Sequence, residues 1–456
     1  MDAAVPNKLL DLAVQSLLSN ESAAIQALED IPRELFVPLF IAAFKGGHKS
    51  ILSAMVKVWP FYCLHIGSLS IQEIHHELLK AMIENLPVCP AQNSSPRTKL
   101  RILDLRQVTY SRITCPEVNT KSPSCFHSCA YSDHSFTKIE GHLRLGNSGF
   151  ETQSPRPVEL LVDLFLAGSL VQKEFLDLLM GKAEESSGSL HVCCRDLQVD
   201  KLHNYKCTLK FLDLKCVDQF SVGKGSLSDI SSIQSQMAHL QIISLFKVSF
   251  RSQRRKVFKN FFSNLQRLEN LNELNLASFY LKNHRDKVLR FIPPGLDFLY
   301  LPFCNLSSRD YQFLSQSPQA THLKLLNLSN NTMYWNDFKA ICTLLVNLSG
   351  MLLYLELNNC LISDSAIPAL IRCTHLCVLG FASNPITMPI LMNIMNNLKP
   401  LMELKYVICP MPVHCFDKWH FQGSLDKRKL AIVQLQLKRM LELAQRNDMN
   451  WITYNE

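Results

Sequence analysis

Five potential zinc ligands fall close together in a polar stretch of the chain. They lie within twenty residues and are Cys115, Cys125, His127, Cys129 and His134. Zinc commonly takes four sulfur and nitrogen ligands that arrive as two closely spaced pairs. Here three residues separate Cys125 from Cys129, and no second pair matches them. The spacing favours a loop that contains cysteines, so we expect no metal or other cofactor. A metal-dependent enzyme centred on this cluster stays open as the third of three hypotheses for function.

Other side chains that could do chemistry are better explained by packing. His75 and His76 are adjacent on a predicted helix and point in different directions, so they do not chelate one ion. Cys193 and Cys194 are adjacent in a predicted strand, where one faces the core and the other faces away. The chain has no Gly-rich phosphate loop, no G-x-S-x-G turn and no HExxH motif. These features predict a protein without catalytic activity.

The composition is that of a folded protein. The chain has 456 residues, of which 47% are hydrophobic and 19% charged, enough for two or three domains or one long solenoid. The net charge of +8 is compatible with acidic or nuclear partners. Its densest basic stretch suits a solvated helix face, a nuclear-import signal or a phosphate site. That stretch consists of Arg251, Arg254, Arg255, Lys256 and Lys259. Aromatic residues are not interleaved with basic ones, so we expect no direct binding to nucleic acid.

The N-terminus, the apolar runs and the cysteines indicate where in the cell the protein is expected. Met1 to Lys8 lack the charged-then-apolar pattern of a signal peptide, and no apolar run is long enough to span a membrane. We therefore expect no membrane association, a cytoplasmic or nuclear location, and sixteen cysteines that stay reduced.

Leucines in the second half of the chain recur with one spacing, L-x-x-L-x-L-x-x-N. Three copies are clear and begin at Leu323, Leu352 and Leu376, and weaker copies begin at Leu271, Leu296 and Leu401. This is the leucine-rich repeat signature, in which each copy supplies a short strand. Counting Leu209 and Leu240 as earlier starts, the copies are 24 to 31 residues apart. That length leaves room for a helix in each repeat, and helical spacing at Ser363 to Ile371 and Met388 to Leu398 supports one. Cys304, Cys360 and Cys409 are expected at the repeat position that Asn fills in other copies.

The pattern predicts an α/β fold: a leucine-rich repeat solenoid, or horseshoe, with an N-terminal helical segment and a C-terminal helical cap. Residues 1–90 form the helical segment, 91–115 an isolated first repeat strand, 116–157 a polar insertion loop, 158–424 the repeats and 425–456 the cap and tail. The strand in 91–115 is marked by Leu100, Leu103 and Leu105, and the cap helix places five apolar side chains on one face. Those five are Leu430, Val433, Leu437, Met440 and Leu441.

A solenoid of this kind leaves one long face free to bind another protein. Its specificity is expected in the exposed residues between the leucines, which would hold a protein substrate. The candidates are Lys324, Asn327, Tyr354, Glu356, Val378 and Lys405.

Two short patterns precede the repeats. Leucines and small residues share one helix face at Leu9, Leu12, Ala13, Ser16 and Leu17. A second pattern, Ile31, Pro32, Leu35 and Leu39, places a proline at a helix start and two leucines on one face. From the residues alone, these leucines either cap the first repeat or dock a partner, and the cap is the simpler reading.

Several stretches resemble the PRAME/oogenesin family of leucine-rich repeat proteins, over nearly the whole chain. The longest is LLDLAVQSLLSNESAAIQALEDIPRELFVPLFIAAF, Leu9 to Phe44. Others are AMVKVWPFYC from Ala54, KLRILDLR from Lys99, PVELLVDLFLA from Pro157, LSQSP from Leu314, and the run from Leu353 through Pro412.

The resemblance implies a substrate receptor of a ubiquitin ligase, in which an elongin-binding box precedes a Cullin-2 box. The Cullin-2 box falls on Ile31, Pro32, Leu35 and Leu39. The elongin box has two possible registers: one from Leu12 and Ser16 ends on Asn20, and one from Leu9 and Ala13 ends on Leu17. The implied partners are elongin B/C, Cullin-2 and a protein substrate, with effects on transcription, differentiation, proliferation and apoptosis.

Some members of that family also carry an LxxLL nuclear-receptor motif near the C-terminus. Here the matching residues are Leu437, Met440 and Leu441, in the sequence LKRML. The broken motif gives weak support to binding of a nuclear receptor. The alternative function is therefore a leucine-rich repeat protein that acts as a transcriptional co-regulator without docking a ligase.

Overall fold

The computed structural model describes residues 9–61, 63–66, 76–87, 99–106, 157–248, 255–279, 292–333, 337–362, 367–417 and 424–453. Nearly all of the predicted insertion, with its cysteine and histidine cluster, and His75 lie outside these ranges. The chain forms two compact units. The first contains Met1–Leu197 and Cys207–Cys216, and the second contains Gln198–Lys206 and Val217–Glu456.

The first unit begins with the predicted helices. Asn20 accepts a hydrogen bond from the backbone N–H of Ala23 and so caps α2, while Gly47, at φ 75°, ends α3 in a left-handed conformation that glycine adopts without strain. The core of this segment is aromatic, because Trp59 packs edge-on against Phe36 and Phe40. These helices are α1 (Leu9–Leu18), α2 (Glu21–Gln26), α3 (Arg33–Gly46), α4 (Lys49–Lys57) and α5 (His76–Glu84).

Four parallel strands follow in chain order in the first unit. They are β1 (Cys63–His65), β2 (Ile102–Asp104), β3 (Val158–Leu166) and β4 (Leu190–Lys201), whose last residues belong to the second unit. Helix α7 (Leu170–Glu185) connects β3 to β4, and the side chain of Ser169 caps its start. The strand predicted near Leu100 is β2, but it is not isolated: Leu103 pairs with Leu64 of β1 and with Leu160 of β3.

The second unit repeats a strand and a connecting segment. In the strands centred on Leu274, Leu299, Leu326 and Leu355, the middle residue is buried and its two neighbours are more exposed, as expected for strands with one covered face. Parallel pairing places the buried leucines in one row, so that Leu299, Leu326, Leu355 and Leu379 lie side by side. The strands are β5 (Gln219–Lys224), β6 (Ile242–Leu245), β7 (Glu273–Asn275), β8 (Phe298–Tyr300), β9 (Leu325–Asn327), β10 (Tyr354–Glu356), β11 (Val378–Gly380), β12 (Tyr406–Cys409) and β13 (Asn450–Thr453).

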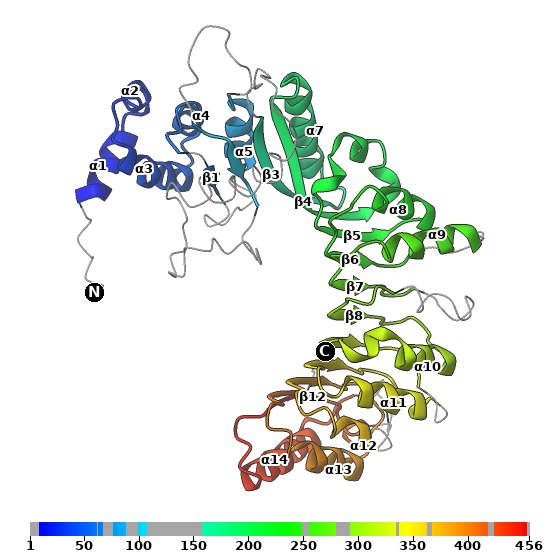
Figure 1. Ribbon diagram of the computed structural model, residues 1–456. Coiled ribbons are helices and arrows are strands. Elements are labelled where there is room, and N and C mark those ends of the chain that lie inside the picture. Colours follow the sequence, from blue (N-terminus) through cyan, green and yellow to red (C-terminus); the bar gives the residue numbers. More distant parts are fainter. Residues whose placement is uncertain are drawn as a thin grey trace. The chain divides into compact units, whose positions relative to one another are not determined.

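Helices cover one side of this ladder, as Figure 1 shows for α8, α9 and α10 beside β5 to β8. The predicted α/β repeat is therefore confirmed, including the expected helix at 388–398. The helices are α8 (Leu227–Gln234), α9 (Arg255–Leu265), α10 (Ser308–Gln316), α11 (Phe338–Leu348), α12 (Ile367–Leu370), α13 (Met388–Leu398) and α14 (Lys427–Leu443). Among the described residues, no helix has the length and apolar character needed to cross a membrane.

Two of the predicted repeat starts are wrong. Leu209 lies in a 3-10 turn, η4 (Thr208–Phe211), which is followed by a second turn, η5 (Leu214–Cys216). The strand of that repeat is β5, where Phe220 pairs with Ile243. Near the C-terminus, Leu379 pairs with Val407, so the repeat begins at Leu404 and not at Leu401. In both places an alternative leucine offered the same spacing, and burial of the strand's central residue set the actual register.

A polar ladder joins the repeats at the asparagine position. Asn331 Nδ2 donates to the carbonyl of Leu301 at 2.8 Å, and Asn384 Nδ2 donates to that of Leu357 at 3.0 Å. The thiols of Cys304 and Cys360 make the same bond to the preceding repeat, at 3.1 and 3.2 Å. Both cysteines thus fill the predicted position. The prediction for Cys409 is wrong, because the pairing of Leu379 with Val407 aligns Cys409 with Phe381.

The C-terminal cap was predicted correctly in its helix and incompletely in its tail. In α14 the five apolar residues expected on one face are all buried. The chain then continues into β13, in which Trp451 pairs with Val407 of β12. Arg446 links the two parts: it is buried, and its guanidinium donates to the carbonyls of Lys399, Leu401 and Leu404. These bonds satisfy carbonyls at the end of the last repeat.

Candidate protein-binding surfaces

Helix α1 leaves its leucine-rich face exposed. Leu9 is 85% exposed and Leu12 is 51% exposed, whereas Val14 is buried. Ala13 and Ser16 are exposed with the leucines, and Leu17 is half-buried. An amphipathic helix normally covers its larger apolar face. The main contacts of α1 with other described elements are with α2 and α3, and the side chains of Leu9 and Leu12 stay exposed, as those of a protein-docking surface would be.

The second short pattern divides between surface and core. Pro32 is exposed and stands immediately before α3, while Ile31 and Leu35 are half-buried. Leu39 is fully buried among the aromatic residues of the helical core. A partner could therefore reach Ile31, Pro32 and Leu35, whereas Leu39 serves the fold.

The sheet of the second unit has an open face opposite its helices. Here "open face" means the two residues on either side of the buried central residue of each strand from β6 to β12, where Ile243 is central in β6 and Val407 is central in β12. Tyr354 pairs with Leu325 and Val378, and Val378 pairs with Tyr406, which makes a continuous apolar row. Both tyrosines are exposed. Rows of apolar and aromatic side chains are typical of surfaces that bind protein segments.

The predicted substrate residues lie on or beside this open face. Tyr354 and Val378 belong to the apolar row. Asn327 and Glu356 belong to a second row, which is formed by the residues on the other side of each buried central residue. There Asn327 Nδ2 donates to Glu356 Oε2 at 2.7 Å. Lys324 and Lys405 stand one residue before their strands and form ion pairs with Asp297 and Asp448. Their positive charges are therefore partly balanced by the protein itself.

The prediction from sequence missed several residues of the open face. Phe298 precedes Leu325 in the apolar row, and Tyr300 precedes Asn327 in the second row. Tyr406 continues the apolar row, and Ile408 continues the second row. The signal was present, because each of these residues flanks the central apolar residue of a strand, but it becomes readable only once each repeat has the right register.

The open face carries partly desolvated acid groups. Partial burial raises the pKa of Glu356 above its usual value. Burial, together with the charges of Glu273 and Glu356, raises the pKa of the Tyr300 hydroxyl to about 12. The phenol is thus neutral at physiological pH and available as a hydrogen-bond donor. Within the described strands, the surface presents apolar rings beside an acidic edge and no arrangement of nucleophile and base.

The broken receptor motif lies inside the fold. Leu437, Met440 and Leu441 are buried side chains of α14. A receptor groove would need these same side chains on the surface. The folded chain therefore does not offer this motif to a nuclear receptor.

Buried cysteines also have structural roles. None of the cysteine side chains that the structure describes forms a disulfide. Burial raises the pKa of Cys304 to about 12 and that of Cys360 to about 11, so both remain protonated donors in the ladder. Cys193 and Cys194 are both buried, which corrects the expectation that one faces outward. Cys193 faces Cys216, at the end of η5, and the two thiols are hydrogen-bonded.

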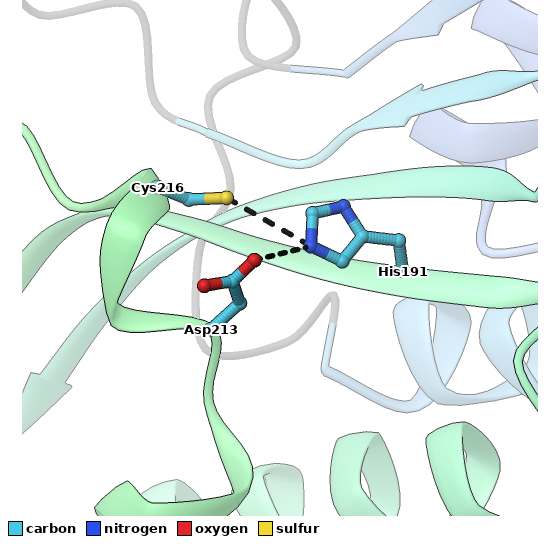
Figure 2. A group of neighbouring side chains, drawn as sticks. All are labelled: His191, Asp213 and Cys216. Carbon is cyan, nitrogen blue, oxygen red and sulfur yellow. Dashed lines mark hydrogen bonds and ion pairs between the residues drawn. The ribbon is translucent and has the colours of Figure 1, made fainter.

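One group of described side chains has the donor types and spacing of a metal site. It consists of His191, Asp213 and Cys216, whose ligand atoms lie within 4.8 Å of one another (Figure 2). His191 Nε2 is 3.3 Å from Asp213 Oδ2 and 3.8 Å from Cys216 Sγ. All three residues belong to the first unit.

The strand ladder with helices on one side defines a leucine-rich repeat protein, a class whose members typically bind other proteins and do not catalyse reactions. The chain also matches two family models: the PRAME N-terminal domain over residues 6–111 and the PRAME C-terminal domain over residues 158–453. The chain belongs to the PRAME family.

Similar proteins agree with this assignment over nearly their whole length. Human PRAME family member 12 is 30% identical over 97% of this chain and 91% of its own. Leucine-rich repeat-containing protein 14 of Bos taurus is 29% identical over 98% of this chain and 97% of its own. A solved internalin structure from Listeria monocytogenes covers 66% of this chain at 14% identity with a TM-score of 0.27, too low for any conclusion.

Proposed function

We propose that this protein is a non-catalytic substrate receptor of a Cullin-2 ubiquitin ligase, acting in the cytoplasm or nucleus. In this role the N-terminal helices dock elongin B/C and Cullin-2, and the open face of the repeat sheet holds a protein substrate. Ubiquitin transfer then follows from proximity, because the ligase supplies the reacting groups.

The exposed leucine face of α1 is the observation that carries the proposal. Capping the solenoid would require these leucines to be covered by the chain, yet Leu9 is 85% exposed and Leu12 is 51% exposed. Burying a fully exposed leucine is worth roughly 1.5 to 3 kcal/mol, so Leu9 forgoes most of that free energy and Leu12 about half of it. A partner groove that covers them recovers that free energy. Exposed Ala13 and Ser16 beside them allow the partner to approach the helix closely.

The region around Pro32 supplies the second contact. Pro32 is exposed at the start of α3, and the neighbouring Arg33 donates to the carbonyl of Pro60 at 3.1 Å and lies over the ring of Phe61. Arg33 is thereby fixed to the aromatic core, which holds the start of α3 in one orientation. A rigid edge of this kind suits a second subunit placed next to the one on α1.

The competing function is a transcriptional co-regulator that binds its partners through the repeats alone. Burial of Leu437, Met440 and Leu441 weighs against its receptor-binding form. The co-regulator makes two predictions of its own. Deleting residues 1–45 should destabilise the repeats, and no ligase subunit should co-purify.

The test is co-purification of the tagged full chain from human cells. We expect elongin B/C and Cullin-2 with the wild type, and loss of both with Leu9→Asp/Leu12→Asp. Pro32→Ala/Leu35→Ala should reduce recovery of Cullin-2 while elongin B/C remains. Gln15→Asp is the matched control, because Gln15 is an exposed residue of α1 outside the leucine face. Ligase subunits that bind the leucine variant and the wild type equally would overturn the docking assignment.

A further inference from the structure

We propose that His191, Asp213 and Cys216 bind a zinc ion that fastens the turn η5 to strand β4. His191 is a residue of β4, and Asp213 and Cys216 begin and end the short segment that contains η5. Figure 2 shows the carboxylate and the thiol both directed at the same ring nitrogen of His191. The donors are one imidazole nitrogen, one carboxylate oxygen and one sulfur, a set that favours zinc over calcium or magnesium.

The distances from the His191 ring nitrogen to its two neighbours match the edges of a zinc tetrahedron. Ligands that lie 2.0 to 2.3 Å from zinc stand about 3.3 to 3.8 Å from one another. Nε2 of His191 is 3.3 Å from Asp213 Oδ2 and 3.8 Å from Cys216 Sγ. The side chains of His191 and Asp213 are 36% and 43% exposed, so water can reach the fourth position.

Hydrogen bonds account for only part of this arrangement. A protonated Nε2 donates to the Asp213 carboxylate but then offers no lone pair to the Cys216 thiol. An unprotonated Nε2 accepts from the thiol but then turns its lone pair toward the carboxylate oxygens. A protonated Nε2 makes one good hydrogen bond and one weak contact, because a thiol sulfur is a poor acceptor, whereas an unprotonated Nε2 leaves the contact with the carboxylate unfavourable. A cation among the three donors satisfies all of them.

Neighbouring groups hold the ligands in place. The second carboxylate oxygen of Asp213 accepts from the backbone N–H of Lys215 at 3.1 Å, which leaves Oδ2 directed at His191. Arg195 Nη1 donates to the carbonyl of Cys216 at 3.4 Å, which ties the end of the turn to β4. The buried Cys193 thiol hydrogen-bonds that of Cys216. Supporting contacts of this type orient ligands in metal sites.

The charges around the three ligands neither favour nor disfavour a bound cation. Glu159 of β3 adds negative charge near Cys216, while Arg195 and Lys215 add positive charge. The selection of a cation therefore rests on the donor geometry. Burial raises the pKa of the Cys216 thiol, so the bound ion has to displace its proton.

The experiment measures zinc in the purified full chain, after growth with added zinc and dialysis under reducing conditions. We expect the wild type to hold one more zinc per chain than Asp213→Asn/Cys216→Ser. The difference is the informative quantity, because cysteines elsewhere in the chain can also hold metal. The control is Cys207→Ser, which changes an exposed cysteine nine residues before Cys216. It should keep the full zinc content.

Two further measurements guard against a variant that simply unfolds. Cobalt loaded in place of zinc should give a thiolate-to-metal charge-transfer band, and Cys216→Ser should lose that contribution. A chelator should lower the melting temperature of the wild type and leave that of a folded Cys216→Ser unchanged. Equal zinc content in the wild type and the double variant, or an unchanged cobalt spectrum in Cys216→Ser, would overturn the assignment.

Discussion

Leu12 and Val14 stand two residues apart in α1 and face opposite ways: Leu12 is 51% exposed and Val14 is 4% exposed. The smaller apolar residue anchors the helix and the larger one is left in water. A helix needs only one face to attach to its own protein. The second face of α1 is therefore available to another chain, which is the basis of the proposed docking to elongin.

This relationship predicts opposite effects on stability. Leu12→Asp should change the melting temperature little, because an exposed substitution usually alters the free energy of unfolding by less than about 0.5 kcal/mol. Val14→Asp buries a carboxylate against α2 and α3 and should cost about 2 to 4 kcal/mol. Thermal unfolding of both variants checks this. Equal destabilisation would show that the leucine face is covered by the chain itself.

The polar ladder makes a prediction about interchangeable residues. Asn331→Ala removes the bonds of Nδ2 to three carbonyls and that of Oδ1 with the N–H of Leu306, so unfolding should become easier by about 2 to 3 kcal/mol. Asn331→Cys should cost less, since Cys304 and Cys360 already donate from the equivalent place. Denaturant unfolding measures both, with the exposed Asn450→Ala as control. A cysteine variant no more stable than the alanine variant would contradict this.

Asp163 predicts a pH dependence of stability. Partial desolvation and then the charge of Asp196 raise the pKa of Asp163 to about 6, from an ordinary value near 4. The folded state therefore binds more protons than the unfolded state between pH 4 and 6, and the contribution of this group to stability falls as the pH rises through that window. Above pH 6 the folded protein carries an unfavourable carboxylate.

Asp163→Asn should remove this effect. The amide oxygen can still accept from the backbone N–H of Asp196, so the variant should be more stable than the wild type at pH 7.5 by about 1 kcal/mol, a value reduced for the exposure of the side chain. At pH 4 the two should be alike. Melting temperatures at both pH values test this, with Asp177→Asn, on the exposed side of α7, as control. A variant that melts lower at pH 7.5 would refute it.

The open face should be separable from the docking face. Tyr354→Ala/Tyr406→Ala removes two exposed rings from the apolar row and should leave the fold intact. We expect it to reduce the recovery of substrate proteins by proximity labelling, while elongin B/C recovery is unchanged. Leu443→Ala, an exposed residue of α14, is the control. An unchanged set of labelled proteins would remove substrate binding from this face.

Much of the fold was predictable because leucine spacing encodes burial. The repeats at Leu323, Leu352 and Leu376 and the buried face of α14 were expected from that rule alone. The register of a strand was harder to predict where the chain has two leucines at a suitable spacing. Leu401 and Leu404 are such a pair, and only the burial of Val407 in the paired strand distinguishes them.

The candidate sites were less predictable than the fold. The sequence placed leucines on one face of α1 but could not say whether that face is covered, because the anchor is the single residue Val14. The sequence pattern also predicted that Leu39 binds a partner, whereas Leu39 is buried in the core that contains Phe36, Phe40 and Trp59. The group of His191, Asp213 and Cys216 has no sequence motif, since a strand and a turn bring it together.

The most direct test of the proposed function is the affinity of the purified full chain for purified elongin B/C, measured by calorimetry. The wild type should bind, Gln15→Asp should bind equally well, and Leu9→Asp/Leu12→Asp should bind at least about 100-fold more weakly, with an unchanged melting temperature. A wild type that does not bind, or a leucine variant with wild-type affinity, would contradict the account of α1 as the docking helix.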